Sequence, residues 1–96
     1  MAEECTVNVA LEKISGRWKM QVLYLIDAGE NRFSVIKSYL KGISDRILGL
    51  RLNELVEDGL IKKNSVNGEI FYTMTNRSLK LIKILDELVL WQEAIK

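Results

Sequence analysis

The chain has 96 residues, of which 48% are hydrophobic, with a formal net charge of +1, one cysteine and no histidine. This length fits a single domain over residues 1–96, and one cysteine excludes an internal disulfide framework. The common zinc sites and histidine-based acid–base catalysis are excluded and no glycine-rich phosphate loop is present, so we expect no enzyme, no metal and no cofactor.

The first half of the chain is predicted to be helical. Residues 7–15 form a first helix with one apolar face, and Gly16 ends it. Residues 18–28 form a second helix, which Gly29 ends. Arg32 and Phe33 are interpreted as a very short strand, after which Ser34 caps a third helix that runs to residue 40.

Residues 43–63 are the most informative part of the chain. Ser44 is a typical helix N-cap, and Gly59 can take the left-handed conformation that ends a helix. Between them, one stripe at helical spacing is apolar and consists of Leu48, Leu52, Leu55 and Val56. The opposite face carries Arg46, Leu50 and Asn53, with Arg51 and Glu54 on its flanks. A helix with a packed back and a polar front, placed a short turn after another helix, indicates a helix-turn-helix.

The last third of the chain is predicted to contain a hairpin and a long helix. Residues 60–65 and 69–74 are interpreted as strands, and the Asn67-Gly68 pair between them is the strongest short-range hairpin signal. Thr75 or Asn76 then caps a helix that runs to about residue 94. The predicted fold is mainly α with a small β-hairpin wing (α+β). It is a winged helix-turn-helix with additional N- and C-terminal dimerisation helices.

The last helix carries more apolar residues than a helix that buries a single stripe needs. Two explanations remain open: a second copy of the chain covers the surplus, or residues 7–15 fold over it within one chain. We favour the second copy, and both can hold. The expected dimer interface consists of Val7, Leu11, Leu81, Leu85, Leu88 and Trp91.

The chain resembles the HxlR-type winged helix-turn-helix transcriptional regulators, which are relatives of the MarR type, from about residue 5 to residue 91. The matching motifs are Cys5-Thr6-Val7, Ile14-Ser15-Gly16-Arg17-Trp18-Lys19, Arg32-Phe33-Ser34, Gly42-Ile43-Ser44, Leu52-Asn53-Glu54-Leu55, Glu57-Asp58-Gly59-Leu60 and Tyr72-Thr73-Met74-Thr75, with Trp91 near the end. The resemblance implies homodimers that bind near-palindromic operator DNA, each copy placing its recognition helix in a major groove. It also makes Cys5 a redox-sensing candidate, because many members sense oxidants or electrophiles through a cysteine at that position.

The chain departs from the family pattern at three places. Asp45 stands where a proline commonly follows the capping serine, and Gly49 and Leu50 stand where polar residues commonly precede the helix arginine. The wing tip, residues 64–68, also lacks an arginine. The operator sequence and the entry of the wing into a minor groove therefore do not follow from the resemblance.

The candidate DNA-binding residues are Ser44, Arg46, Leu50, Arg51, Asn53, Lys62, Lys63 and Asn64. Arg46, near the helix N-terminus, can hydrogen-bond a guanine edge or hold a phosphate. Arg51 can contact DNA, or it can pair with Glu54 and Glu57 and orient the helix. Leu50 can touch a thymine methyl group or be a tolerated exposed residue.

The other candidates also have two interpretations each. Lys62 and Lys63 can neutralise phosphates, or they can blunt the edge of a soluble strand. Ser44 can cap its helix while the neighbouring N–H groups hold a phosphate. The thiol of Cys5 is favoured as a thiolate by the nearby helix N-terminus and disfavoured by Glu3 and Glu4, so it is either a sensor or inert.

These observations predict a dimeric, sequence-specific DNA-binding transcriptional regulator, with double-stranded DNA and a second copy as partners. Residues 32–63 carry seven basic and four acidic side chains, a modest positive block at the expected reading helix and wing. No run of about 20 apolar residues is present, so we expect no membrane partner and a cytoplasmic location. The alternative is a winged-helix protein-interaction module that does not bind DNA. Leu50 and the near-neutral charge leave that alternative open, and the effector is not specified.

Overall fold

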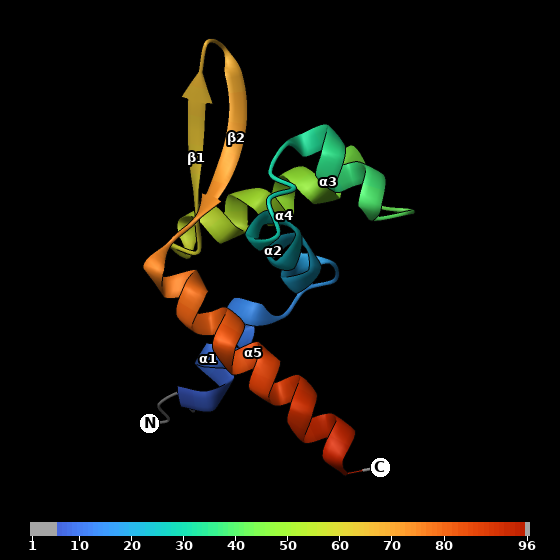
Figure 1. Cartoon of the computed structure of the whole chain (residues 1–96), viewed down its shortest axis with the longest axis vertical. Coiled ribbons are helices and arrows are strands. Elements are labelled where there is room, and N and C mark those ends of the chain that lie inside the picture. The colour runs from blue at the N-terminus through green and yellow to red at the C-terminus, as the bar shows by residue number, and fades with distance from the viewer. Residues whose placement is uncertain (1–5, 96) are drawn as a thin grey trace.

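The computed structural model describes residues 6–95, which form five helices and one hairpin (Figure 1). The elements in chain order are α1 (Thr6–Ile14), α2 (Lys19–Asp27), α3 (Phe33–Tyr39), α4 (Asp45–Glu57), β1 (Ile61–Val66), β2 (Glu69–Met74) and α5 (Asn76–Ala94). This order is the winged helix-turn-helix predicted from the sequence. Cys5 lies outside the described residues. Within residues 6–95, no helix is both long and apolar enough to cross a bilayer.

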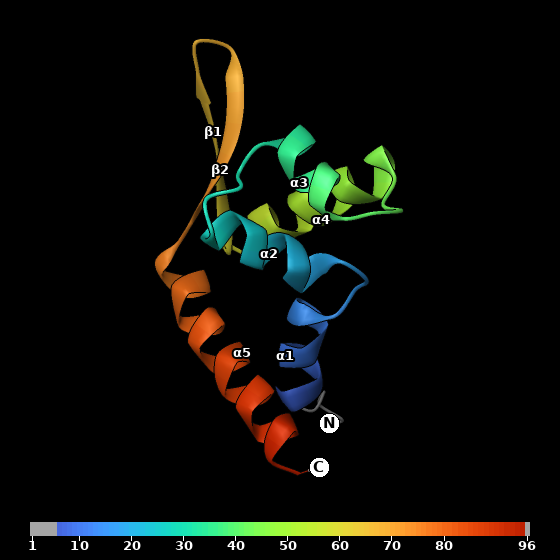
Figure 2. The ribbon, with the colours of Figure 1, turned by 45° about the vertical axis from the view of Figure 1, so that its right-hand side comes forward.

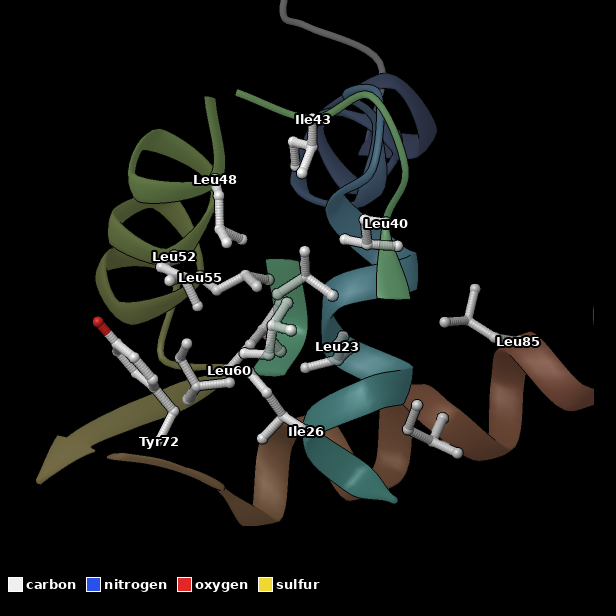
Figure 3. Packing of buried hydrophobic residues seen from close by; sticks show 14 residues of the cluster. Leu23, Ile26, Leu40, Ile43, Leu48, Leu52, Leu55, Leu60, Tyr72 and Leu85 are labelled. Carbon is white, nitrogen blue, oxygen red and sulfur yellow. The ribbon is translucent and has the colours of Figure 1, made fainter. Parts of the chain in front are cut away.

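The hydrophobic core lies where α2, α3 and α4 meet the base of the hairpin (Figure 3). Leu23, Leu48 and Leu55 are fully buried, and Tyr72 of β2 reaches the same cluster. Each large aliphatic side chain buried in this way contributes about 1.5–3 kcal/mol relative to exposure. The core therefore fixes the back of α4 and leaves its front to solvent.

Helix α4 begins and ends as its sequence predicts. The N–H of Ile47 donates to Ser44 Oγ at 3.1 Å, which satisfies one of the free donors of the first turn. At the other end Gly59 has a φ of 75°, and the N–H groups of Gly59 and Leu60 donate to the carbonyls of Val56 and Leu55. This pair of bonds is a Schellman motif, so the chain leaves the helix in one direction and enters β1 directly.

The wing is the two-stranded antiparallel hairpin of β1 and β2, paired from Ile61 opposite Met74 to Val66 opposite Glu69. Asn67 and Gly68 both have positive φ values, 53° and 82°, as a two-residue hairpin turn requires. The hairpin extends away from the helices (Figure 1). The second strand is as predicted, and the first both begins and ends one residue later than expected.

The prediction of a short strand at Arg32 and Phe33 is wrong, and so is the prediction that Ser34 caps the third helix. Helix α3 already begins at Phe33 and its N-cap is Arg32, whose side chain makes no capping hydrogen bond. The contact with the hairpin lies one residue earlier, where the Tyr72 N–H donates to the Asn31 carbonyl at 3.0 Å. A single backbone bond is enough to join this loop to β2, and no strand forms.

Helices α1 and α5 lie together at the end of the molecule opposite the wing (Figure 2). Thr75 and Ser78 form a capping box that starts α5. Of the apolar residues of α5, only Ile82 and Leu85 are buried within the chain. Leu85 is 7% exposed and belongs to the core, so its assignment to the dimer interface is wrong. Ile84, Leu88, Trp91 and, on α1, Val7 and Leu11 remain exposed.

Candidate nucleic-acid interface

The outward face of α4 carries Arg46, Leu50 and Asn53, one above the other at helical spacing. All three side chains are exposed, and Leu50 retains 42% of its surface. The opposite face packs Leu48, Leu52 and Leu55 into the core. The predicted division of the helix is confirmed for these residues. Val56, expected on the buried stripe, is instead 36% exposed at its edge.

Arg46 and Arg51 lie in different environments. Arg46 is exposed in the first turn of α4, and no ion pair joins it to another residue of 6–95. Arg51 is bound by its own chain: its Nε donates to the Arg17 carbonyl at 2.8 Å, and its Nη1 lies 3.0 Å from Glu54 Oε1. Of the two roles considered for Arg51, the geometry supports the positioning one. Only 16% of its side chain is exposed.

The segment before α2 is shaped to receive Arg51. The Arg51 guanidinium packs against the backbone at Gly16, where a Cβ atom would lie in ordinary contact, 3.4 Å from Arg51 Cζ. Gly16 and Trp18 have φ values of 117° and 76°, and the Arg17 guanidinium lies 5.0 Å from the Trp18 ring centroid. Arg51 therefore fastens α4 to a tightly turned segment, and this segment leads into α2.

The entry to α4 is also held by an ion pair. Lys37 Nζ of α3 lies 3.2 Å from Asp45 Oδ1. Both side chains are largely exposed, so the pair contributes little stability, about 0–1 kcal/mol. It does join the two helices of the helix-turn-helix beside Ser44 and neutralises the acid nearest to the α4 N-terminus.

The wing residues divide between two surfaces. Lys62 and Lys63 are both exposed, but as neighbours on a strand they point to opposite faces of the hairpin. Lys63 shares its face with Ile61 and with Tyr72, its partner across the hairpin, both of which are buried in the core. Lys62 points to the other face. The two lysines therefore do not form one basic patch.

Asn64 is occupied within the hairpin. Its Nδ2 donates to Thr73 Oγ1 at 3.1 Å and to the Lys62 carbonyl at 3.2 Å. The bond to Thr73 ties β1 to β2 on the Lys62 face, and the bond to Lys62 lies within β1. The expectation that Asn64 contacts DNA receives no support from this geometry, because its amide donors are already used.

Sequence reasoning missed Arg32 as a member of this surface. Arg32 Nη1 lies 2.6 Å from Glu69 Oε1, so the loop before α3 is joined to the second strand of the wing. The pair also compensates the negative charge of Glu69, the acidic residue nearest to the hairpin turn. The only sequence signal was the charge of Arg32, because its partner is 37 positions away.

A charged network behind α4 was also missed. Lys19 Nζ lies 3.2 Å from Asp58 Oδ2 and 3.8 Å from Glu54 Oε1, and its side chain is only 5% exposed. Lys13 of α1 approaches the other oxygen of Asp58 at 3.5 Å. Together with Arg51, these residues connect α1, α2 and the C-terminal half of α4. A lysine near the start of an amphipathic helix carries no signal of such burial in its sequence.

Helix α5 is joined to α2 by a hydrogen bond between Tyr24 and Asp86. The Tyr24 hydroxyl donates to Asp86 Oδ1 at 2.7 Å. Burial and, after it, this bond to a carboxylate raise the pKa of Tyr24 to about 12. Burial also raises the pKa of Tyr72. Among residues 6–95, no cluster of three potential metal ligands is present.

Comparisons with known proteins agree with this architecture. The model of the HxlR-like helix-turn-helix family matches residues 13–96. The chain belongs to this family. Its function class, a helix-turn-helix transcriptional regulator, is confirmed with it.

Individual relatives extend the similarity to nearly the whole chain. An HTH-type transcriptional regulator of Methanothermobacter thermautotrophicus is 37% identical over 90 residues, which are 91% of this chain and 69% of the relative. A MarR-family regulator structure from Enterococcus faecalis V583 has a TM-score of 0.87 at 30% identity and covers 99% of this chain and 92% of its own. The redox regulator HypR in its reduced form has a TM-score of 0.81 at 28% identity, with 94% and 92% covered. The winged fold is thus shared along the full length of the described residues.

Proposed function

We propose that this regulator binds near-palindromic duplex DNA as a homodimer in the cytoplasm and has no catalytic activity. The observation that carries the proposal is the exposed Arg46–Leu50–Asn53 face of α4, presented by a helix whose back is fully packed. Helices of this kind enter the major groove through their N-terminal residues. Ser44 and Arg46 stand at that end, and two copies would cover half-sites about 34 Å apart, one helical turn of DNA.

Arg46 is proposed to hydrogen-bond a base edge, and Leu50 to contact a thymine methyl group beside it. Asn53 extends the same face toward the middle of the helix. Lys63, and to a smaller extent Lys62, are proposed to neutralise phosphates. Lys37 is engaged by Asp45 and Arg51 by Glu54, so both are proposed to position α4.

The test begins with selection of duplex fragments by the purified protein, followed by mobility-shift titrations at several salt concentrations. Arg46→Ala is expected to cost about 1–3 kcal/mol at the selected operator and less on random DNA. Lys83→Ala, an exposed lysine on α5 away from α4, is the matched control. Equal loss on both DNAs would mean that Arg46 holds only phosphate. Absence of any salt-sensitive preference among duplexes would favour the protein-interaction module instead.

The homodimer is proposed from the apolar surface that α1 and α5 leave exposed. Ile84 and Trp91 retain 63% and 60% of their surface and Leu88 retains 49%, all on α5. Val7, Leu11, Leu88 and Trp91 therefore remain in the proposed interface, whereas Leu81 is partly buried and Leu85 belongs to the core. Surfaces of this kind are typically covered by a second copy.

Leu88→Asp tests the dimer without touching the core. Because Leu88 is exposed within one chain, the variant is expected to stay folded and to sediment as a monomer, since a charge would otherwise be desolvated in the interface. Glu87→Ala, its exposed neighbour, is the control. A wild-type protein that sediments as a folded monomer at micromolar concentration would contradict the proposal.

Cys5 is proposed as the site through which oxidants or electrophiles act on this regulator. The support is its place one residue before α1 and the similarity to HypR, a redox regulator whose structures include reduced and oxidised forms. The rate of Cys5 alkylation against pH tests the idea. A midpoint below about 8.5 is expected for an activated thiol, and Cys5→Ser is expected to keep DNA binding but lose the oxidant response. A midpoint at or above that value would mean that Cys5 is inert.

A further inference from the structure

A groove of about 390 Å³ lies between α2 and α3, two helices that run side by side (Figure 2). Helix α2 contributes Gln21, Tyr24 and Leu25, which share one of its faces, and the end of α3 contributes Tyr39 and Leu40. This volume is within the range of small-molecule sites, about 300–1,000 Å³. None of these residues belongs to the proposed DNA surface or to the apolar surface of α1 and α5, so the groove is a separate feature of the molecule.

The accessible part of the groove is mainly aromatic. Tyr24 retains 36% of its surface and Tyr39 retains 57%. Leu40, in contrast, is 6% exposed and belongs to the core. A molecule that enters the groove therefore meets the two tyrosine rings before it meets the leucine of the core.

The hydroxyl groups of both tyrosines are bonded to carboxylates. The Tyr24 hydroxyl donates to Asp86 Oδ1 at 2.7 Å, and the Tyr39 hydroxyl donates to Glu30 Oε2 in a longer bond of 3.4 Å. These bonds restrict how the two rings can turn. A phenol that donates to an anion also has a more negative ring face, and the ring face is the part of an aromatic side chain that attracts cations.

The charges around the groove are predominantly negative. None of the lining residues is itself charged. Besides the two carboxylates that accept the tyrosine hydroxyls, Asp27 adds negative potential at Tyr24, one turn earlier on α2. Lys37 and Lys41, the lysines on either side of the end of α3, are not lining residues, and Lys37 is paired with Asp45. The groove therefore favours a positive charge near its rings.

The rest of the lining determines what kind of cation fits. Leu25 and Leu40 offer no oxygen or nitrogen ligand, and Gln21 is the one lining residue with an amide. A bare metal ion would lack the set of oxygen or nitrogen ligands that such ions require. A cation with apolar substituents can lose water at little cost and can contact both the rings and the leucines.

We infer that this groove binds an organic cation, a quaternary or aryl-substituted ammonium, with its charge over the rings of Tyr24 and Tyr39. Its apolar substituents then lie against Leu25 and Leu40. The inference concerns ligand binding only and does not depend on the proposed DNA binding, so each can fail without the other.

The probe is phenyltrimethylammonium, and tert-butylbenzene has nearly the same shape without the charge. Nuclear magnetic resonance titration of the full chain follows the ring signals of its three tyrosines. The signals of Tyr24 and Tyr39 are expected to shift saturably with the cation. Tyr72, which is 7% exposed and lies in the core, is the internal control and is expected not to shift. The cation is expected to bind more tightly than the uncharged molecule.

Tyr39→Leu keeps an apolar side chain but removes one ring. It is expected to weaken binding of the cation by about two- to fivefold, the effect of one cation–π contact at an exposed site, and to leave tert-butylbenzene unchanged. Tyr39→Phe keeps the ring and is the matched control, with cation binding close to that of the wild type. Because Tyr39 is exposed, both variants are expected to retain the circular dichroism and thermal unfolding of the wild type.

Three results would overturn the inference. Equal cation affinity in Tyr39→Leu and Tyr39→Phe would mean that the ring makes no contact with the charge. Equal affinity of the wild type for the cation and for tert-butylbenzene would mean that the groove selects only apolar surface. The absence of a saturable shift at Tyr24 and Tyr39 would mean that the groove is closed or covered in the protein in solution.

Discussion

The ammonium group of Lys19 lies 3.2 Å from the carboxylate of Asp58, although the two residues are 39 positions apart. Lys19 opens α2 and Asp58 is the C-cap of α4, so the pair joins the start of one helix to the end of the other. With 5% and 18% of their side chains exposed, both groups are largely withdrawn from water. The pair therefore constrains where the recognition helix ends relative to the core.

Lys19→Met is expected to lower the free energy of unfolding by about 2–3 kcal/mol, because it leaves Asp58 and Glu54 partly buried with fewer partners. Lys13→Met removes a cation from the same carboxylate, but Lys13 is 55% exposed, so a loss of at most about 1 kcal/mol is expected. Urea unfolding of both variants measures the difference. Equal losses would show that burial of Lys19 adds nothing to this ion pair.

Arg51→Ala is expected to act on stability and not on sequence preference. Loss of the charge-assisted bond from Nε to the Arg17 carbonyl should cost about 1–3 kcal/mol of unfolding free energy. Operator and random DNA should then be weakened by the same factor, in contrast to Arg46→Ala. If the variant has wild-type stability and loses affinity only for the operator, Arg51 contacts DNA directly.

Lys63→Ala is expected to flatten the salt dependence of DNA binding by about 0.9 in the slope of log K against log salt, because one phosphate is no longer neutralised. Lys62→Ala should have a smaller effect. The reason is that Lys63 shares its hairpin face with Ile61 and Tyr72, the side from which the core and α4 continue. Parallel titrations of the two variants decide the matter, and a larger effect of Lys62→Ala would contradict the assignment of faces.

Asp86→Asn is expected to lower the pKa of Tyr24 from about 12 toward its ordinary value of 10, without reaching it, because burial remains. The raised pKa also has a consequence for folding. The unfolded chain releases this proton first, so the contribution of Tyr24 to stability is complete below about pH 10 and is lost as the pH rises through about 12. Ultraviolet titration, with Tyr24→Phe to assign the signal, measures the shift. An unchanged midpoint in Asp86→Asn would show that burial alone raises the pKa.

Features determined by a few neighbouring residues could be predicted from the sequence. The cap at Ser44, the stop at Gly59 and the Asn67-Gly68 turn each depend on residues within one turn of chain, and all three are present as predicted. The outward face of α4 followed from helical spacing alone. These local signals were sufficient for the fold and for the front of the recognition helix.

The remaining features depend on where distant segments meet. Nothing near Lys19 or Arg51 in the sequence indicates that Lys19 would find a partner 39 positions away, or Arg51 one 34 positions away. Leu85 and Leu88 are both apolar residues of one helix, and only packing against the core separates the buried one from the exposed one. The strand predicted at Arg32 does not form for a similar reason, because one hydrogen bond from Tyr72 of β2 to Asn31 is enough to place that loop.

Side chains alternate between the two faces along β1, so odd and even changes in the length of the wing have different effects on its surface. Insertion or deletion of one residue between Ile61 and Lys63, matched by one residue opposite it in β2, would exchange the faces of every position beyond it, while the tight Asn67-Gly68 turn would keep the two strands paired. Such a change would place a different lysine on the face of the hairpin that continues into α4, without any substitution at either lysine. Changes of two residues in each strand would preserve the faces and alter only the reach of the wing. Among related regulators, each strand of the wing should therefore differ in length mostly by even numbers of residues wherever the same face is kept.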